Sequence, residues 1–169
     1  MKIVVVAGAD RTGKSTLTKE FTRRGWKYRH FGPPKGSPFA EYRGFADALA
    51  SNGNPDGKYI VDRYMYCEFP YSKHYGRETD MTIWDMNAIE ETLLMLDPSA
   101  TIVYCETDLE SNWKRIQDEG KGEFKSIEEL AALKAEYERV LSKSRFRVLR
   151  YDFTKGDAPA AFVSAMESR

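Results

Sequence analysis

Residues 3–16 read Ile3-Val4-Val5-Val6-Ala7-Gly8-Ala9-Asp10-Arg11-Thr12-Gly13-Lys14-Ser15-Thr16, and this stretch decides the fold. Its first part is a β-branched run, which is typical of a strand covered on both faces in a parallel sheet. Its second part, residues 8–15, matches the pattern G-x-x-x-x-G-K-[ST] at every defined position. Because a strand precedes this loop and a helical pattern follows it, the sequence predicts a phosphate-binding P-loop.

The P-loop pattern gives each of its residue types a separate task. Glycines let backbone N–H groups turn toward phosphate, and the helix N-terminus adds partial positive charge. Lys14 can reach β- and γ-phosphate oxygens, and the Ser15 hydroxyl can ligate Mg²⁺. We therefore predict ATP and Mg²⁺ as ligands. The nucleotide-binding residues expected from this loop are Gly8, Asp10, Thr12, Gly13, Lys14, Ser15 and Thr16.

Two charged residues, Asp10 and Arg11, occupy variable positions of the loop. A P-loop has no structural need for a carboxylate and a guanidinium there. Arg11 can lie along the migrating phosphoryl group and stabilise its charge, as an arginine finger supplied in cis does. The alternative is a solvated surface pair. We expect Arg11 and Lys14 to be catalytic.

A second cluster, Asp62-Arg63-Tyr64, ends the strand expected at residues 59–62. In an open parallel sheet the carboxyl ends of the strands line the ligand crevice, so this cluster is expected beside the P-loop. Asp62 can hold Mg²⁺ through water or orient the attacking oxygen, and Arg63 can bind an acceptor phosphate in a forked geometry. We expect Asp62 and Arg63 to be catalytic, and Ser15 and Asp62 to be the metal ligands. The alternative is that Asp62 and Arg63 form a salt bridge that fixes the start of a helix.

Strand and helix patterns alternate along the chain, which predicts an α/β fold with a five-stranded parallel sheet and helices on both faces. One domain is expected over residues 1–169. Pro70 is expected to keep the aromatic-rich segment 64–77 irregular, and Ser126 with Glu129 forms a predicted capping box. Strands are expected at 3–7, 27–31, 59–62, 101–106 and 147–151, and helices at 14–24, 39–51, 81–96, 109–118, 127–142 and 158–167.

The charge balance is neutral, with 26 Lys+Arg against 26 Asp+Glu. This argues against a nucleic-acid coat or a polybasic membrane binder, and no stretch approaches the ~20 apolar residues of a membrane span. Cys67 and Cys105 form no disulfide framework, which fits a reducing cytosol and predicts a cytoplasmic protein. The balancing carboxylates are expected on outer helices, as at Glu90-Glu91 and Glu128-Glu129.

Together the two motifs resemble those of the thymidylate kinase family. That family joins a P-loop bearing Asp-Arg to a downstream Asp-Arg-Tyr, which here read Asp10-Arg11-x-Gly13-Lys14-Ser15-Thr16 and Asp62-Arg63-Tyr64. The resemblance implies a P-loop kinase fold and a nucleoside monophosphate kinase. Such an enzyme transfers the γ-phosphoryl group of ATP to a deoxynucleoside monophosphate, with dTMP or a related pyrimidine nucleotide, modified ones included, as the expected acceptor.

The resemblance also implies an acceptor site. In the family an aromatic residue and an arginine one helical turn apart hold the acceptor base, and Phe39 and Arg43 have this i, i+4 spacing. Phe39 is alternatively a core residue. Lys35 stands where the family's Phe-Pro-x-Arg turn carries its arginine. The implied acceptor-binding residues are Asp10, at the sugar 3′-hydroxyl, with Lys35, Phe39, Arg43 and Arg63.

Residues 115–126 fall where the family carries its lid. Arg115 resembles the arginine that packs on the donor adenine. Lys121 and Lys125 can approach the phosphates when the lid closes, or belong to a solvated charged loop. Family members are commonly homodimers, and the aromatic-rich segment 64–75 is the expected surface candidate for such a contact.

Three alternatives stay open. A deoxynucleoside kinase would need a carboxylate base near the acceptor, whereas Lys35, Arg43 and Arg63 favour a monophosphate. A kinase that acts on a modified base within DNA would need a basic surface to bind a duplex, and the neutral chain offers none to spare. Binding of single-stranded DNA stays open as an alternative. Arg11 counts against a non-catalytic nucleotide-binding domain. Because an acceptor phosphate is already anionic, no base is required, so His30 is expected to be structural and His74 to lie at the surface.

Overall fold

The computed structural model describes residues 1–120, 124–156 and 158–168. Its centre is a five-stranded sheet with the strand order β2-β3-β1-β4-β5, and each neighbouring pair of strands is parallel. The strands are β1 (Lys2–Ala7), β2 (Lys27–His30), β3 (Lys58–Asp62), β4 (Thr101–Cys105) and β5 (Arg147–Tyr151).

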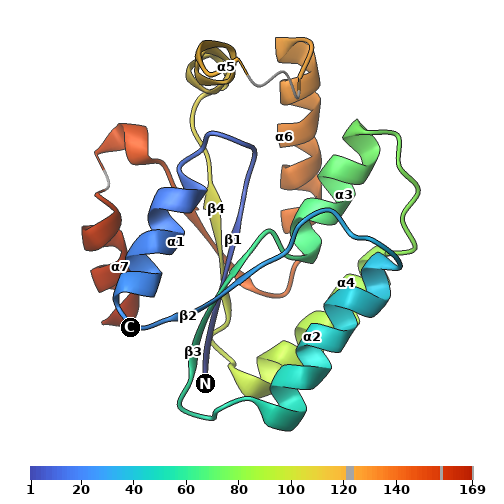
Figure 1. Cartoon of the computed structure of the whole chain (residues 1–169), viewed down its shortest axis with the longest axis vertical. Coiled ribbons are helices and arrows are strands. Elements are labelled where there is room, and N and C mark those ends of the chain that lie inside the picture. The colour runs from blue at the N-terminus through green and yellow to red at the C-terminus, as the bar shows by residue number, and fades with distance from the viewer. Residues whose placement is uncertain (121–123, 157, 169) are drawn as a thin grey trace.

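Helices cover both faces of the sheet, as Figure 1 shows. One face carries α1 (Lys14–Arg23) and α7 (Pro159–Glu167), and the other carries α2 (Pro38–Asn52), α3 (Met65–His74), α4 (Ile83–Leu96) and α6 (Ile127–Leu141). Helix α5 (Leu109–Asp118) lies beyond the carboxyl ends of the strands, and a 3-10 turn, η1 (Phe153–Lys155), follows β5. The predicted fold class is therefore confirmed.

Burial on both faces explains the apolar run of β1. Val4 and Val6 face α1 and α7, where they pack with Leu17 and Phe21. The alternate residues of the strand, Val5 among them, join the larger core under α2, α3, α4 and α6. Side chains of a strand point alternately to its two faces, so a strand between two helical layers needs apolar residues at every position.

Helix α3 contradicts the expectation that residues 64–77 are irregular. Pro70 lies inside this helix, where it removes one backbone hydrogen bond. The packing of α3 offsets that loss, because Tyr66 and Phe69 on the helix are buried in the core. The same burial contradicts the expected aromatic docking surface, although Tyr75 at the end of the segment is exposed. Homodimer formation stays a prediction without this surface.

The capping box expected at the start of α6 is incomplete. Ser126 accepts a hydrogen bond from the Glu129 N–H at 3.4 Å, but the Glu129 carboxylate accepts from the Lys125 N–H, so the predicted box is only half formed. A complete capping box starts α4 instead, between Thr82 and Asp85. Among the described residues, no helix combines the length and apolar character that crossing a membrane requires.

Glu90 is buried, which contradicts its expected place on a solvated helix face. Its carboxylate accepts hydrogen bonds from the Tyr66 hydroxyl and the Arg145 N–H, each at 2.8 Å, and from the Ser144 hydroxyl. Its neighbour Glu91 is exposed and faces Arg145 at 3.8 Å. Position 90 thus lies on the inner face of α4 and serves as an acceptor for three donors, and burial raises the pKa of its carboxyl group.

This raised pKa predicts how stability depends on pH. A carboxyl group that holds its proton longer in the folded state contributes most at low pH, and that contribution falls as pH rises past the unfolded pKa. The unfolding temperature of Glu90→Gln should therefore increase relative to wild type from about pH 4 to about pH 7. Glu90→Leu should lose about 3 kcal/mol of stability near pH 4, because it leaves buried donors without an acceptor, and the loss should be smaller near pH 7. Parallel pH profiles for wild type and Glu90→Gln would contradict the argument.

Candidate active site

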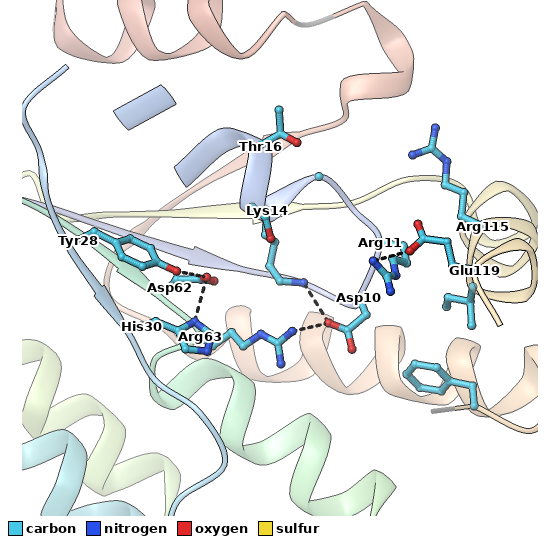
Figure 2. Close-up of a pocket in the computed structure, with 14 residues that line it drawn as sticks. Asp10, Arg11, Lys14, Thr16, Tyr28, His30, Asp62, Arg63, Arg115 and Glu119 are labelled. Carbon is cyan, nitrogen blue, oxygen red and sulfur yellow. Dashed lines mark hydrogen bonds and ion pairs between the residues drawn. The ribbon is translucent and has the colours of Figure 1, made fainter. Parts of the chain in front are cut away.

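A cavity of about 720 Å³ opens at the carboxyl ends of the strands. It brings together the P-loop, the ends of β2 and β3, and one face of α5 (Figure 2). This is the place where open parallel sheets bind ligands. Its lining includes the P-loop residues Asp10, Arg11, Gly13, Lys14, Ser15 and Thr16, then Tyr28, His30, Asp62 and Arg63, and finally Arg115, Ile116, Glu119 and Phe124.

Glycine is required at two positions of the P-loop. Gly8 has a φ of 140°, and a side-chain carbon there would lie 2.2 Å from the Cys105 carbonyl oxygen. Gly13 has a φ of 87°, and a side-chain carbon would lie 2.8 Å from the Phe153 ring. The loop is thus wedged between β4 and η1, and only glycine permits both the backbone conformation and the close approach.

Lys14 and Arg63 meet at a single carboxylate, that of Asp10. The Arg63 guanidinium donates to Asp10 Oδ1 at 2.7 Å, and the Lys14 ammonium lies 3.7 Å from the same oxygen. Lys14 is buried, and its ammonium also donates to the Ala9 carbonyl. The P-loop and the end of β3 therefore present two cations to one point of the cavity (Figure 2).

Backbone strain is concentrated at two of the predicted catalytic residues. In the described part of the chain, the non-glycine residues in the left-handed region are Arg11, with φ 65°, and Arg63, with φ 58°. Each such conformation costs about 1–3 kcal/mol and persists where the surroundings hold it. The Arg63 N–H donates to the Val6 carbonyl at 3.1 Å, which anchors one of the two strained residues to β1.

Two arginines that line the cavity beside α5, Arg11 and Arg115, are each engaged with another side chain. The Arg11 guanidinium lies 2.7 Å from a Glu119 carboxylate oxygen, and both side chains are partly exposed. Arg115 stacks its guanidinium on the Phe153 ring, 4.2 Å from the ring centre. The aromatic wall at Phe153 was not anticipated from the sequence. The predicted contact of Arg115 with an adenine ring stays a prediction.

Asp62 is held by two side chains that sequence analysis did not assign to the site. Its Oδ2 accepts from the Tyr28 hydroxyl at 3.0 Å and lies 3.1 Å from His30 Nδ1. Partial burial and the neighbouring Asp62 carboxylate raise the pKa of Tyr28 to about 12, so its hydroxyl remains a donor in alkaline solution as well. His30 is exposed and lines the cavity, and its expected structural role stays a prediction. Its register partner in the sheet is Asp62, a pairing that depends on strand order.

The residues present fit a magnesium ion. Asp62 Oδ1 is buried and has no hydrogen-bond partner within the described chain, which is costly unless a ligand satisfies it. Ser15 lines the same cavity with an exposed side chain. The described residues contain no cluster of three or more His, Cys, Asp or Glu arranged around a metal. This donor set suits Mg²⁺, which is held by one or two protein groups together with substrate phosphates.

The three predicted acceptor residues on or before α2 do not line the cavity. Lys35 is exposed in the loop that precedes the helix. Arg43 pairs with Asp47 at 2.9 Å, one helical turn further on. Phe39 packs against the large core, and its N–H donates to Asp80. Their roles in binding an acceptor stay predictions, because they are not among the residues that line the cavity together with Arg63 and Asp10.

The remaining predicted residues divide between loop structure and lid. Thr12 is buried, and its hydroxyl donates to the Ala9 carbonyl at 2.8 Å. Lys121 lies outside the described residues, and Lys125 is exposed. Phe124 is buried beside the His74 ring, 4.6 Å between ring centres, and lines the cavity. A lone aromatic residue in a charged loop was the signal that could have assigned Phe124 to the site.

The fold and the P-loop define the class: the chain has the fold of P-loop kinases. It matches no protein-family model, and no curated protein matches its sequence. Solved structures do match, and the three described next share 17–18% identity with this chain, so the likeness is one of fold.

The YorR protein from Bacillus subtilis, in complex with phosphorylated GDP, aligns with 17% identity and a TM-score of 0.77 over 98% of this chain and 93% of its own. Deoxyadenosine kinase from M. mycoides with bound dCTP aligns with 18% identity and a TM-score of 0.57, over 99% and 98% of the two chains. Thymidylate kinase from Candida albicans aligns with 18% identity and a TM-score of 0.56, over 98% and 89%.

Proposed function

We propose that this chain transfers the γ-phosphoryl group of ATP to a deoxynucleoside monophosphate, with a pyrimidine nucleotide such as dTMP as the acceptor. The observation that carries the proposal is the meeting of Lys14 and Arg63 at Asp10 within one cavity. Lys14 belongs to the loop that is expected to hold the donor phosphates. Arg63 follows a different strand, β3, and is not part of that loop. Two phosphate-binding groups from separate elements suit a donor and an acceptor.

The mechanism we propose needs positioning and neutralised charge, since phosphoryl transfer demands little covalent chemistry from the protein. Lys14 contacts the donor phosphate oxygens, and Arg11 leaves its exposed ion pair with Glu119 to contact the migrating group. Arg63 binds the acceptor phosphate through its planar fork. Mg²⁺, when bound, neutralises phosphate charge, and Ser15 and Asp62 are the residues that would hold it.

A deoxynucleoside kinase is the second candidate, and a specific observation favours it. Of Lys35, Arg43 and Arg63, the residues expected to favour a monophosphate, Arg63 alone lines the described cavity. Asp62 also presents a buried oxygen that lacks a hydrogen-bond partner in the described chain. A hydroxyl acceptor, unlike a phosphate, needs such a carboxylate as a general base. The likeness to deoxyadenosine kinase in fold is compatible with this candidate.

A panel of acceptors with ATP and Mg²⁺ tests both candidates. Ribo- and deoxynucleoside monophosphates, the matching nucleosides and short single-stranded DNA are each incubated with the protein, and the products are separated by ion-exchange chromatography. We expect conversion of a pyrimidine deoxynucleoside monophosphate to its diphosphate, with one ADP formed per product. Turnover of nucleosides alone would move the assignment to the second candidate, and labelled DNA would move it to a nucleic-acid kinase.

The variant Arg63→Met separates the two acceptors further. It retains an unbranched side chain but removes the group proposed to bind acceptor phosphate, so the KM for a monophosphate should rise at least about 30-fold while the KM for ATP changes little. Arg29→Met on the neighbouring strand is a suitable control, because Arg29 is exposed and does not line the cavity. ADP formation with no acceptor dependence in wild type would remove both candidates.

A further inference from the structure

Three consecutive carbonyl groups of the P-loop each accept a hydrogen bond from a side chain. The Gly8 carbonyl accepts from the Tyr137 hydroxyl at 3.1 Å. The Ala9 carbonyl accepts from Thr12 and Lys14 within the loop itself. The Asp10 carbonyl accepts from Asn112 Nδ2 at 2.8 Å. Two of these donors therefore come from helices far along the chain, Asn112 from α5 and Tyr137 from α6.

Asn112 is an unusual residue for its surroundings. Its side chain is fully buried, and its Oδ1 has no hydrogen-bond partner among the described residues. An amide with one unsatisfied buried atom stabilises a fold less than an apolar residue of the same size. Its backbone N–H is bonded to the Asp108 carbonyl at 3.0 Å, so the residue is fixed in the first turn of α5. Stability alone does not explain an asparagine here, whereas its contact with Asp10 does.

The contact acts on the strained part of the loop. The Asp10 carbonyl belongs to the peptide that joins Asp10 to Arg11, and Arg11 is one of the two left-handed non-glycine residues of the described chain. The peptide is planar and trans, so a fixed carbonyl also fixes the direction of the Arg11 N–H, which points the opposite way. The hydrogen bond from Asn112 to the Asp10 carbonyl oxygen therefore fixes the orientation of the Asp10–Arg11 peptide plane.

The same face of α5 touches the P-loop and cavity at further points. Ile116, four residues after Asn112, lines the cavity, and Glu119, seven residues after it, pairs with the Arg11 guanidinium. Residues at this spacing share one helix face. Two contacts from α5 and its C-terminal end thus restrain Arg11. Asn112 bonds to the peptide that precedes Arg11, and Glu119 pairs with the Arg11 side chain.

We propose that Asn112 is a positioning residue for the P-loop, which holds the Asp10–Arg11 peptide so that Arg11 keeps its left-handed backbone and its place at the cavity. Asn112 does this without touching nucleotide. Its effect on catalysis rests on the proposed function, but its effect on the conformation of the loop does not.

Hydrogen–deuterium exchange of the nucleotide-free protein tests the proposal directly. In Asn112→Leu and in Asn112→Ala, the amides of residues 10–13 should exchange about three to ten times faster than in wild type, because one hydrogen bond no longer restrains the loop. The matched control is Asn87→Leu on α4, another asparagine whose Oδ1 is buried without a partner in the described chain. It should leave these amides unchanged.

The two Asn112 variants separate hydrogen bonding from packing. Leucine fills the site and alanine leaves a void, so an equal effect of both on the loop identifies the lost hydrogen bond as the cause. If Asn112→Leu fails to fold, Asn112→Ala, which adds no atoms, carries the test. Unchanged exchange at residues 10–13 in a folded Asn112 variant overturns the proposal.

Steady-state kinetics provide the readout that depends on the proposed function. Both Asn112 variants should lower kcat at saturating ATP by about tenfold, with the KM for ATP altered less than about threefold. Faster exchange in the variants of a protein that transfers no phosphoryl group would support the positioning role and remove the proposed function. Normal phosphoryl transfer in wild type together with unchanged exchange in both variants would do the reverse.

Discussion

Lys14→Met is expected to lower ATP-dependent phosphoryl transfer by at least about 10³-fold while the protein stays folded. Lys14 is nearly buried, its ammonium donates to the Ala9 carbonyl, and it lies 3.7 Å from Asp10 Oδ1. The ammonium is therefore already held in place at the cavity before any nucleotide binds. Methionine keeps a long unbranched side chain of similar volume but cannot neutralise the charge that develops on the phosphates.

The stability of this variant distinguishes a functional lysine from a structural one. A buried amine is costly to desolvate, so its replacement by methionine should leave the unfolding temperature equal to or above that of wild type. Lys19→Met is a suitable control, because Lys19 is exposed on the same helix and does not line the cavity. Initial rates at saturating acceptor and a thermal melt of each variant are measured. Turnover within about tenfold of wild type in Lys14→Met would contradict the assignment of the P-loop.

Local patterns were sufficient to predict most of the fold. The run of β-branched residues in β1 predicts burial on both faces, and its alternate residues do join the two separate cores. Apart from α3 and η1, the element boundaries lie within two residues of those expected from the sequence. The P-loop belongs to this class of feature, because its glycines, lysine and flanking elements are all adjacent in the chain.

Long-range packing decided the features that could not be predicted. Pro70 interrupts a helical hydrogen bond, yet the burial of Tyr66 and Phe69 outweighs that loss, and no local propensity contains this information. Glu90 is adjacent to Glu91 in sequence, but only Glu90 is buried and accepts from the Ser144 hydroxyl and the Arg145 N–H, whereas Glu91 is exposed. In each case the interacting residues lie on a different element, so the sequence alone could not show that the buried arrangement is the favoured one.

The candidate site shows the same division. Lys14, Arg63 and Asp62 could be assigned because each stands in a motif at the end of a strand. Tyr28 and His30 reach Asp62 only because β2 pairs with β3, and Asn112 and Phe153 reach the P-loop only because α5 and η1 pack against it. Conversely, a spacing of four residues predicts a shared helix face but not its direction, and Phe39 and Arg43 do not line the cavity.

Arg11→Ala is expected to reduce kcat by about 10³-fold and to change the affinity for ATP by less than about threefold. In the nucleotide-free protein Arg11 pairs with Glu119 across a partly exposed gap, an interaction worth only about 0–1 kcal/mol, so it yields easily to a phosphoryl group. The expected contact between Arg11 and the migrating phosphoryl group strengthens as charge develops in the transition state. Its removal should therefore lower kcat rather than the affinity for ATP. Arg11→Lys should recover little activity, because an ammonium lacks the planar fork of a guanidinium.

The backbone of Arg11 supplies a second, independent measurement. Its φ of 65° is unfavourable for alanine and for lysine but acceptable for glycine. Arg11→Gly should therefore be inactive like Arg11→Ala yet about 1 kcal/mol more stable than it in chemical unfolding. The exposed Arg23→Ala on α1, outside the cavity, should retain full activity. If Arg11→Gly were instead no more stable than Arg11→Ala, the left-handed conformation would not be a source of strain. If Arg11→Ala bound ATP much more weakly at an unchanged kcat, Arg11 would serve the ground state rather than the transition state.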